Sequence, residues 1–178
     1  MFVRTERLTL RPGWAEDAPV LARAIADPGI VTMLSRAPWP YALSDAQAFL
    51  ALPEKIDEPR FLIFEHIGPA VALVGGIGVH RDERGQRELG YWLAPEARGR
   101  GLMTEAGAAL LATLSDSLRI PQLVAGHFTD NPASARVLAR LGFRPTGEIR
   151  RRPCLARGSD VDCVMHEWRA ANPLALAA

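Results

Sequence analysis

Cysteine and long apolar runs are scarce in this chain, and each shortage excludes a class of protein. The two cysteines, Cys154 and Cys163, are too few for a disulfide framework and lack the spacing of a metal site. Two free thiols in a reducing cytosol are the expected state, with one disulfide as the alternative. No run of about 18 apolar residues occurs, so we expect no membrane span. The N-terminal residues are charged and carry no apolar core, so we expect no signal peptide. These points predict a cytoplasmic protein without a metal site.

An excess of charge of either sign is also absent. The chain has 21 Lys+Arg and 20 Asp+Glu residues, a formal net charge of +1. Binding to the phosphates of a nucleic acid normally leaves a basic footprint, so this balance argues against nucleic acid as the main partner. The basic run Arg150-Arg151-Arg152, expected after a strand, is interpreted as a solvated face, with guidance of an acidic substrate as the alternative.

The chain has the composition of an ordinary globular protein and the length of one domain. Its 178 residues are 48% hydrophobic and 23% charged. At about 150 residues per domain, this length predicts one domain, which we place at residues 1–169. The Ala-rich end, residues 170–178, is expected to be a frayed tail.

Hydrophobic periodicity predicts about seven strands and about four helices, and therefore an α/β (α+β) fold class. The strands up to residue 94 follow one another through short turns, which favours an antiparallel meander. The order strand, helix, strand across residues 88–128 implies a parallel pair, so the sheet is expected to be mixed. Ser44, with Gln47 three residues later, is the expected N-cap of the second helix. The expected strands are 8–10, 61–66, 71–80, 88–94, 123–128, 143–149 and 162–168, and the expected helices are 14–26, 44–52, 101–118 and 131–141.

The segment Arg98-Gly99-Arg100-Gly101-Leu102-Met103 lies between an expected strand and an expected helix. Its two glycines allow a tight turn and a close approach of the backbone to a ligand. The helix that follows begins with unpaired N–H groups and a positive dipole end, which together favour an anion such as phosphate. A glycine-rich turn with two solvated arginines is the alternative, because a pair of glycines alone is a weak signal.

Other phosphate motifs fit this sequence less well. A Walker loop requires Gly-Lys-Ser/Thr, but the only lysine, Lys55, lies between Glu54 and Ile56. A dinucleotide fingerprint requires a further glycine where Thr104 stands, although Asp130 could serve as its ribose-binding acid. A dinucleotide-binding domain is therefore kept as an alternative.

Three segments occur in a defined order along the chain: Glu-Leu-Gly-Tyr-Trp-Leu at 88–93, the glycine-rich loop at 98–103, and Asn-Pro-Ala-Ser through Leu-Gly-Phe at 131–143. They resemble the fourth strand, the pyrophosphate loop and the second cofactor helix of the GCN5-related N-acetyltransferases (GNAT), within them the ribosomal-protein N-terminal acetyltransferase-like (RimJ/RimL-type) group. The resemblance extends over nearly the whole chain, from Thr5 to Trp168. It implies a single-domain fold with a splayed sheet, acetyl-CoA as the acetyl donor between the fourth and fifth strands, and a homodimer as one oligomeric option.

The resemblance also implies roles for residues that contact the donor. Backbone amides of the loop would hold the pyrophosphate, and the backbone near Leu93 would polarise the thioester carbonyl. Asn131 and Ser134 would contact the pantetheine arm and the region of the sulfur. The implied cofactor-binding residues are Leu93, Arg98, Gly99, Arg100, Gly101, Leu102, Met103, Asn131 and Ser134. Leu138 departs from the family, because many members have a tyrosine acid at this position.

Acetyl transfer to an amine needs a general base that takes the proton of the amine. A general acid near the leaving thiolate makes the transfer easier. Glu88 is the candidate base, directly or through water, and its alternative reading is an exposed charge at a strand edge. Ser134 is the candidate acid or sulfur contact, and its alternative reading is a hydroxyl bonded within its own helix. His80 and His127 are further candidates for the base, although a histidine at a strand end is usually structural.

These observations predict an N-acetyltransferase in which a primary amine attacks acetyl-CoA directly. The acceptor is a protein N-terminus or a small-molecule amine, because a shared scaffold does not fix the substrate. Two alternatives from other classes are a non-catalytic CoA-binding module and the dinucleotide-binding domain.

Overall fold

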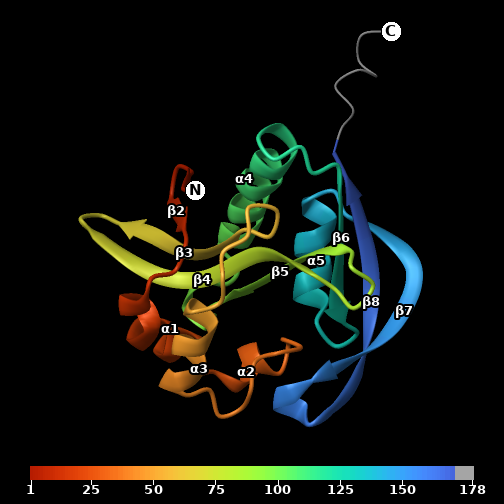
Figure 1. Cartoon of the computed structure of the whole chain (residues 1–178), viewed down its shortest axis with the longest axis horizontal. Helices are drawn as coiled ribbons and strands as arrows, with labels where there is room; N and C mark the ends of the chain where they lie inside the picture. The colour runs from red at the N-terminus through yellow and green to blue at the C-terminus, as the bar shows by residue number, and fades with distance from the viewer. Residues whose placement is uncertain (171–178) are drawn as a thin grey trace, which may run out of the picture.

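The computed structural model describes residues 1–170, which form one eight-stranded sheet and five α-helices (Figure 1). The strands are β1 (Val3–Arg4), β2 (Leu8–Arg11), β3 (Arg60–Ile67), β4 (Ala70–Arg81), β5 (Arg87–Leu93), β6 (Gln122–Phe128), β7 (Arg144–Cys154) and β8 (Ser159–Arg169). The α-helices are α1 (Ala18–Ile25), α2 (Pro28–Val31), α3 (Leu43–Leu50), α4 (Leu102–Asp116) and α5 (Pro132–Arg140).

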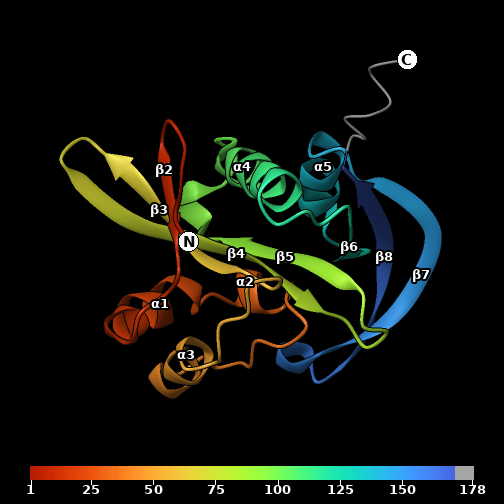
Figure 2. The same cartoon turned by 45° about the horizontal axis from the view of Figure 1, so that its top comes forward.

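Neighbouring strands of the sheet are antiparallel except at one position. The strand order is β1-β2-β3-β4-β5-β6-β8-β7, so the first five strands form a meander. β5 and β6 are parallel, because α4 carries the chain back across one face between them. Figure 2 shows α4 and α5 on that face and α1, α2 and α3 on the opposite face. The prediction of a single-domain α/β fold with a mixed sheet is confirmed.

The larger hydrophobic core lies between the sheet and α4. One stripe of α4 that includes Leu102, Leu110 and Leu114 is fully buried, as its helical spacing predicts. These side chains belong to one cluster with apolar residues of the strands, such as Leu89 on β5. Smaller clusters under α1, α2 and α3 cover the opposite face. Apolar packing on both faces therefore fixes the position of β5.

The pairing between β5 and β6 is unusually short. It is limited to two adjacent positions, and the second of them joins Leu89 to Ala125. By contrast, β4 and β5 pair from Arg81 with Arg87 to Gly75 with Leu93. Beyond Leu89 the parallel strands no longer form a ladder, which agrees with the splay that the resemblance implies. Backbone groups on the facing edges are therefore left without a strand partner.

Three local predictions differ from the structure. β1 and α2 are absent from the predicted elements, because two residues of strand and one turn of helix are too short to show a periodic pattern. The prediction of Ser44 as an N-cap is wrong. Ala42 is the N-cap of α3, and the Asp45 carboxylate accepts the N–H of Ala42 at 2.7 Å. Ser44 therefore lies inside the first turn.

Two predictions concern the ends of the chain and membranes. The expected Ala-rich tail falls, from residue 171 onward, outside the described residues. Among the helices of residues 1–170, none is long and apolar enough to cross a bilayer.

The packing of α4 on the sheet can be tested at Leu110, which is fully buried. We expect Leu110→Ala to lower the free energy of unfolding by about 2–5 kcal/mol, because it removes buried methyl groups and leaves a cavity. Urea denaturation measures this change. Leu155→Ala, at a position that is 59% exposed, is the control and should change the value by less than about 0.5 kcal/mol. Equal losses in the two variants would contradict the assignment of the core.

Candidate active site

The loop between β5 and α4 depends on two glycines for its backbone conformation. Gly99 and Gly101 have φ angles of 75° and 80°, in the left-handed region that other residues rarely adopt. An added Cβ at Gly99 would meet nothing within 4 Å, so conformation rather than crowding requires glycine there. Gly101 is the N-cap of α4. The predicted tight turn at the start of a helix is therefore present.

This turn leaves a run of backbone N–H groups without partners. Among the hydrogen bonds of residues 1–170, none is donated by the amides of residues 99–104, and the run ends at Glu105, whose N–H reaches Gly101 O at 3.0 Å. The run includes the unpaired donors of the first turn of α4, where the helix dipole adds positive potential. Such an arrangement suits an anion, and above all the oxygens of phosphate groups.

The two arginines of the loop contact other parts of the protein. Arg98 Nε donates to the carbonyl oxygen of Leu93 at 3.2 Å. The two terminal nitrogens of Arg100 donate to the two carboxylate oxygens of Glu65, a residue of β3 that is buried. Sequence reasoning missed Glu65, because no local pattern in a strand marks a buried acid. Both arginines remain exposed, as the alternative of a glycine-rich turn with two solvated arginines expects, but each is also hydrogen-bonded to the protein. The backbone of the loop is therefore the part left available for a ligand.

The backbone of Leu93 faces the opening between β5 and β6. The N–H of Ala94 bonds to Val74 O at 2.9 Å, so the backbone groups of Ala94 face β4. These groups alternate in direction along a strand, so those of Tyr91 and Leu93 face β6 instead. No residue of β6 pairs with either of them. The N–H of Leu93 is therefore placed where it can donate to a group bound in the opening.

Ser134, on α5, is hydrogen-bonded to β5 through its side chain. Its hydroxyl oxygen lies 2.7 Å from the hydroxyl oxygen of Tyr91, which also donates to the Ser134 carbonyl at 3.2 Å. The reading in which the Ser134 hydroxyl bonds within its own helix is therefore wrong. Asn131 caps the helix, because its Oδ1 accepts the N–H of Ser134 at 3.1 Å. Burial raises the pKa of Tyr91 to about 12, against a lowering by its hydrogen bond to Ser134, so Tyr91 stays a neutral hydroxyl at physiological pH.

Sequence reasoning missed the pair of Tyr91 and Ser134. A strand-to-helix contact between residues 43 positions apart has no local signal. The position at which many family members have a tyrosine, Leu138, is fully buried in the core and contributes only packing.

Glu88 lies on the other face of β5, because side chains alternate along a strand and Glu88 is three residues before Tyr91. Glu88 is buried and accepts a hydrogen bond from Arg152 at 2.9 Å. Nε2 of His80 lies 3.6 Å from the same carboxylate oxygen. Burial lowers the pKa of His80, Arg36 and Arg152 add to this, and the nearby carboxylates oppose it. Glu88 is therefore not an exposed strand-edge charge, and His80 is a neutral neighbour of it at pH 7.

The basic run lies inside β7 instead of after a strand. Arg150 bonds to Asp82 at 2.9 Å and Arg152 bonds to Glu88, whereas Arg151, between them, points away and is exposed. The interpretation of the run as a solvated face is wrong for Arg150 and Arg152, because alternation along the strand turns both toward the buried carboxylates.

The remaining histidine candidate, His127, is not close to Glu88. On β6 it has the same orientation as Ala125, whose side chain is in the cluster under α4. Its ring lies against that of His166 in a tilted arrangement, with ring centroids 5.2 Å apart. The structure therefore brings His80 to Glu88 and places His127 on the opposite face of the sheet.

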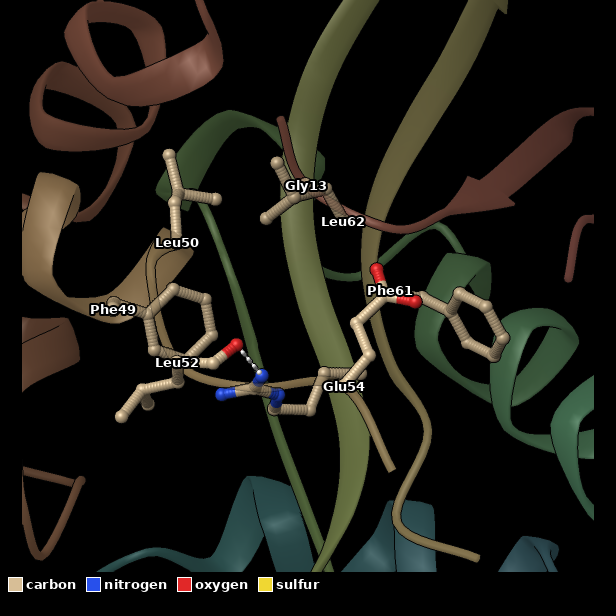
Figure 3. A pocket seen from close by; sticks show the side chains of 8 residues that line it. Gly13, Phe49, Leu50, Leu52, Glu54, Phe61 and Leu62 are labelled. Atoms are coloured by element: carbon tan, nitrogen blue, oxygen red, sulfur yellow. Dashed lines mark hydrogen bonds between the residues drawn. The ribbon is translucent and has the colours of Figure 1, made fainter. Parts of the chain in front are cut away.

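Two cavities in the described part of the chain lie away from the opening between β5 and β6. Figure 3 shows one of ≈ 30 Å³ beside α3, lined mainly by apolar side chains that include Phe49, Leu50 and Leu62. Another, of ≈ 240 Å³, lies between the β4–β5 turn and β7 and is lined by charged residues such as Asp82 and Arg150. Neither includes a residue of the glycine-rich loop or of α5. The candidate site is the opening between β5 and β6 together with that loop.

Comparison with known proteins gives the family. The chain matches the acetyltransferase (GNAT) domain over residues 7–144. This match covers more than half of the chain, so the protein belongs to the GNAT acetyltransferase family. It is accordingly an N-acetyltransferase that uses acetyl-CoA as its acetyl donor.

Individual relatives agree with this assignment. The uncharacterized N-acetyltransferase p20 of Bacillus licheniformis is 29% identical over 150 residues, which are 82% of this chain and 84% of the relative. The structure of RimL, a ribosomal L7/L12 α-N-protein acetyltransferase in complex with coenzyme A, has a TM-score of 0.80 at 18% identity, covering 95% of this chain and 98% of that one, which shows a shared fold. The structure of MccE, a microcin C7 self-immunity acetyltransferase in complex with acetyl-CoA and AMP, has a TM-score of 0.76 at 20% identity, covering 93% and 94%.

The loop can be tested with Gly101→Val. A β-branched residue is strained at a φ of 80°, so the amides would turn away from their present directions and the affinity for acetyl-CoA should fall by more than about tenfold. Calorimetric titration measures the dissociation constant. Gly85→Val, in the β4–β5 turn at a φ of 75° with open space around it, carries a similar strain and should keep the affinity. Wild-type affinity in Gly101→Val would mean that the anion site lies elsewhere.

Proposed function

We propose that this enzyme transfers the acetyl group of acetyl-CoA to a primary amine, which attacks the thioester directly without an acyl-enzyme. One observation carries the proposal: the unpaired amides of residues 99–104 adjoin the opening that begins after Leu89. The amides suit the diphosphate of the donor. The opening offers strand edges to which the amide groups of the pantetheine arm can bond, as an added strand would.

The donor supplies an activated thioester, and the chain supplies its position. The proposed donor-binding residues are Leu93, Arg98, Gly99, Arg100, Gly101, Leu102, Met103, Asn131 and Ser134. In the loop the backbone is the contacting part, while the side chains of Arg98 and Arg100 hold the loop in place. The N–H of Leu93, which faces the opening, would stabilise the negative charge that develops on the thioester oxygen during attack.

Glu88 is the proposed base, and His80 connects it to the surface. The side chain of His80 is 34% exposed and lies between the buried Glu88 carboxylate and solvent. A proton from the attacking amine would therefore pass to Glu88 through His80 or through water. Arg152 holds the Glu88 carboxylate in position. His80 can accept a proton at neutral pH because its pKa is lowered, chiefly by burial.

Ser134 is the proposed acid, on the opposite face of β5 from Glu88. The Tyr91 hydroxyl has one proton, so when it is donated to the Ser134 hydroxyl oxygen instead of the Ser134 carbonyl, the Ser134 proton is free to point into the opening. There it would hydrogen-bond the departing sulfur and protonate it, while Tyr91 returns a proton to the Ser134 oxygen and regains one from solvent. The base would thus act on the amine and the acid on the thiolate from two sides of the same strand.

The acceptor is proposed to be a protein N-terminus or a small-molecule amine. On the α2 side, the tip of the β7–β8 hairpin is bonded to the segment after α2: Arg157 Nε donates to Thr32 O at 2.7 Å, and the N–H of Leu155 donates to Ser35 O at 3.2 Å. We propose that this contact borders the path of the acceptor, which would favour a chain end or a small molecule over a side chain within a folded surface. Among proteins of this fold, RimL is named for acetylation of a ribosomal protein at its α-amino group, which supports the protein N-terminus as one of the two acceptors.

Location and assembly follow as further proposals. The two free thiols, Cys154 and Cys163, are both buried and are consistent with a reducing cytoplasm. A homodimer is a prediction that light scattering on the purified protein would test.

The function itself is tested by thiol release from acetyl-CoA. The panel contains peptides with free N-termini, the same peptides with blocked N-termini, and small amines. We expect release that depends on a free amine. Binding of acetyl-CoA without release of thiol for any amine would favour the non-catalytic CoA-binding module. Leu138 is consistent with that alternative, because many family members have a tyrosine acid at this position. A rise in the melting temperature of the protein with NAD, without binding of acetyl-CoA, would favour the dinucleotide-binding domain.

The base is tested with Glu88→Gln. Loss of a general base should lower kcat about 10²–10⁴-fold, while the dissociation constant of acetyl-CoA stays unchanged. His66→Gln is the control, since this histidine bonds to Thr9 at 2.8 Å on a strand away from the opening. It should keep full activity. An unchanged kcat in Glu88→Gln would remove Glu88 from the mechanism.

The acid is tested with Ser134→Ala and Tyr91→Phe, alone and combined. Each should lower kcat by about tenfold or more, and the double variant should be little worse than Ser134→Ala, because Tyr91 acts through Ser134. Tyr41→Phe, a half-buried tyrosine in the core under α1 and α3, is the control and should keep kcat. Additive losses in the double variant would show that the two hydroxyls act independently.

A further inference from the structure

A carboxylate stands in the first turn of α4, beside the proposed diphosphate site. Glu105 follows Leu102, the first residue of the helix, by three positions. An acid there stabilises the helix dipole, but the same negative charge repels a bound diphosphate. The donor site therefore has an electrostatic conflict that some other group must offset.

The turn between β1 and β2 surrounds this carboxylate. The Thr5 hydroxyl donates to one oxygen of Glu105 at 2.6 Å, and the backbone N–H of Arg7 donates to the same oxygen at 3.1 Å. The guanidinium of Arg7 binds the second oxygen through Nε at 2.7 Å and NH2 at 2.6 Å. Burial raises the pKa of Glu105, but these hydrogen bonds and the charge of Arg7 outweigh it and hold the pKa below its usual value. Glu105 is thus ionised and paired at neutral pH.

Arg7 also fixes one peptide plane of the loop. Its third nitrogen, NH1, donates to the carbonyl oxygen of Arg100 at 3.1 Å. In a trans peptide the C=O and the following N–H point in opposite directions. The N–H of Gly101 therefore points away from Arg7, and it is one of the unpaired amides of the loop.

We propose that Arg7 is a positioning residue of the donor site, which neutralises Glu105 and orients the Gly101 amide toward the diphosphate of acetyl-CoA. This inference rests on the proposed function and adds to it a residue more than 90 positions before the loop. Arg7 acts through Glu105 and the loop backbone, so its effect should be confined to the diphosphate end of the donor.

The test compares two donors in Arg7→Met: acetyl-CoA, and S-acetylpantetheine, which has the thioester and the arm but no diphosphate. We expect the KM for acetyl-CoA and the dissociation constant of CoA to rise by about tenfold or more, with kcat unchanged. The kcat/KM for S-acetylpantetheine should stay at the wild-type value. Arg4→Met, which removes an exposed arginine from the same hairpin, is the control and should change none of these constants.

Two further variants separate the two effects of Arg7. Removing the repelling charge in Arg7→Met/Glu105→Gln should restore part of the lost CoA affinity. Arg7→Lys keeps the charge but not the three-nitrogen geometry, so it should bind CoA with intermediate affinity. If Arg7→Met does not fold, acetyl-CoA and S-acetylpantetheine are compared in Arg7→Lys instead.

The possible failures are distinguishable. If the wild-type protein transfers acetyl from neither donor, the proposed function fails. If the wild type is active, and Arg7→Met or Arg7→Lys binds CoA with the affinity of the wild type, only the role of Arg7 is overturned. An equal loss with both donors would also overturn it, because Arg7 would then support the fold in general and not the diphosphate end.

Discussion

The interruption of pairing between β5 and β6 is the feature on which the other parts of the site depend. These parallel strands pair only as far as Leu89 and Ala125, so the edges that follow keep unbonded N–H and C=O groups. Buried backbone groups are rarely left unpaired, and the unpaired edge is therefore best understood as a binding surface. Helices on both faces of the sheet fix the strands on either side of the opening (Figure 2).

The proposed chemistry follows from which groups this opening separates. Residues of β5 alternate between two faces, so Glu88 with His80 lies on one side and Tyr91 with Ser134 on the other. The loop at the end of β5 turns through two left-handed glycines and presents its amides beside the same opening. A donor bound by those amides would extend between the two pairs of side chains.

Much of this arrangement is predictable from sequence, and the limit is set by distance along the chain. The loop, the helix starts at residues 102 and 132 and the order of the strands have local signals in glycine spacing and apolar periodicity. The pairs Arg100 with Glu65, Tyr91 with Ser134, and Arg152 with Glu88 have none, because each joins residues that only the folded sheet brings together. The run of arginines at 150–152 shows the same limit. Its charges suggest a solvated face, but buried carboxylates on other strands bind Arg150 and Arg152.

The most direct test of the account is amide hydrogen exchange of the wild-type protein with and without acetyl-CoA. Binding of the donor to the unpaired backbone predicts slower exchange in two segments, residues 90–94 at the open edge of β5 and residues 99–104 in the loop. It predicts little change at the paired strands β3 and β4. Binding of acetyl-CoA that leaves both segments exchanging as fast as in the free protein would contradict the claim that the unpaired backbone is the donor site.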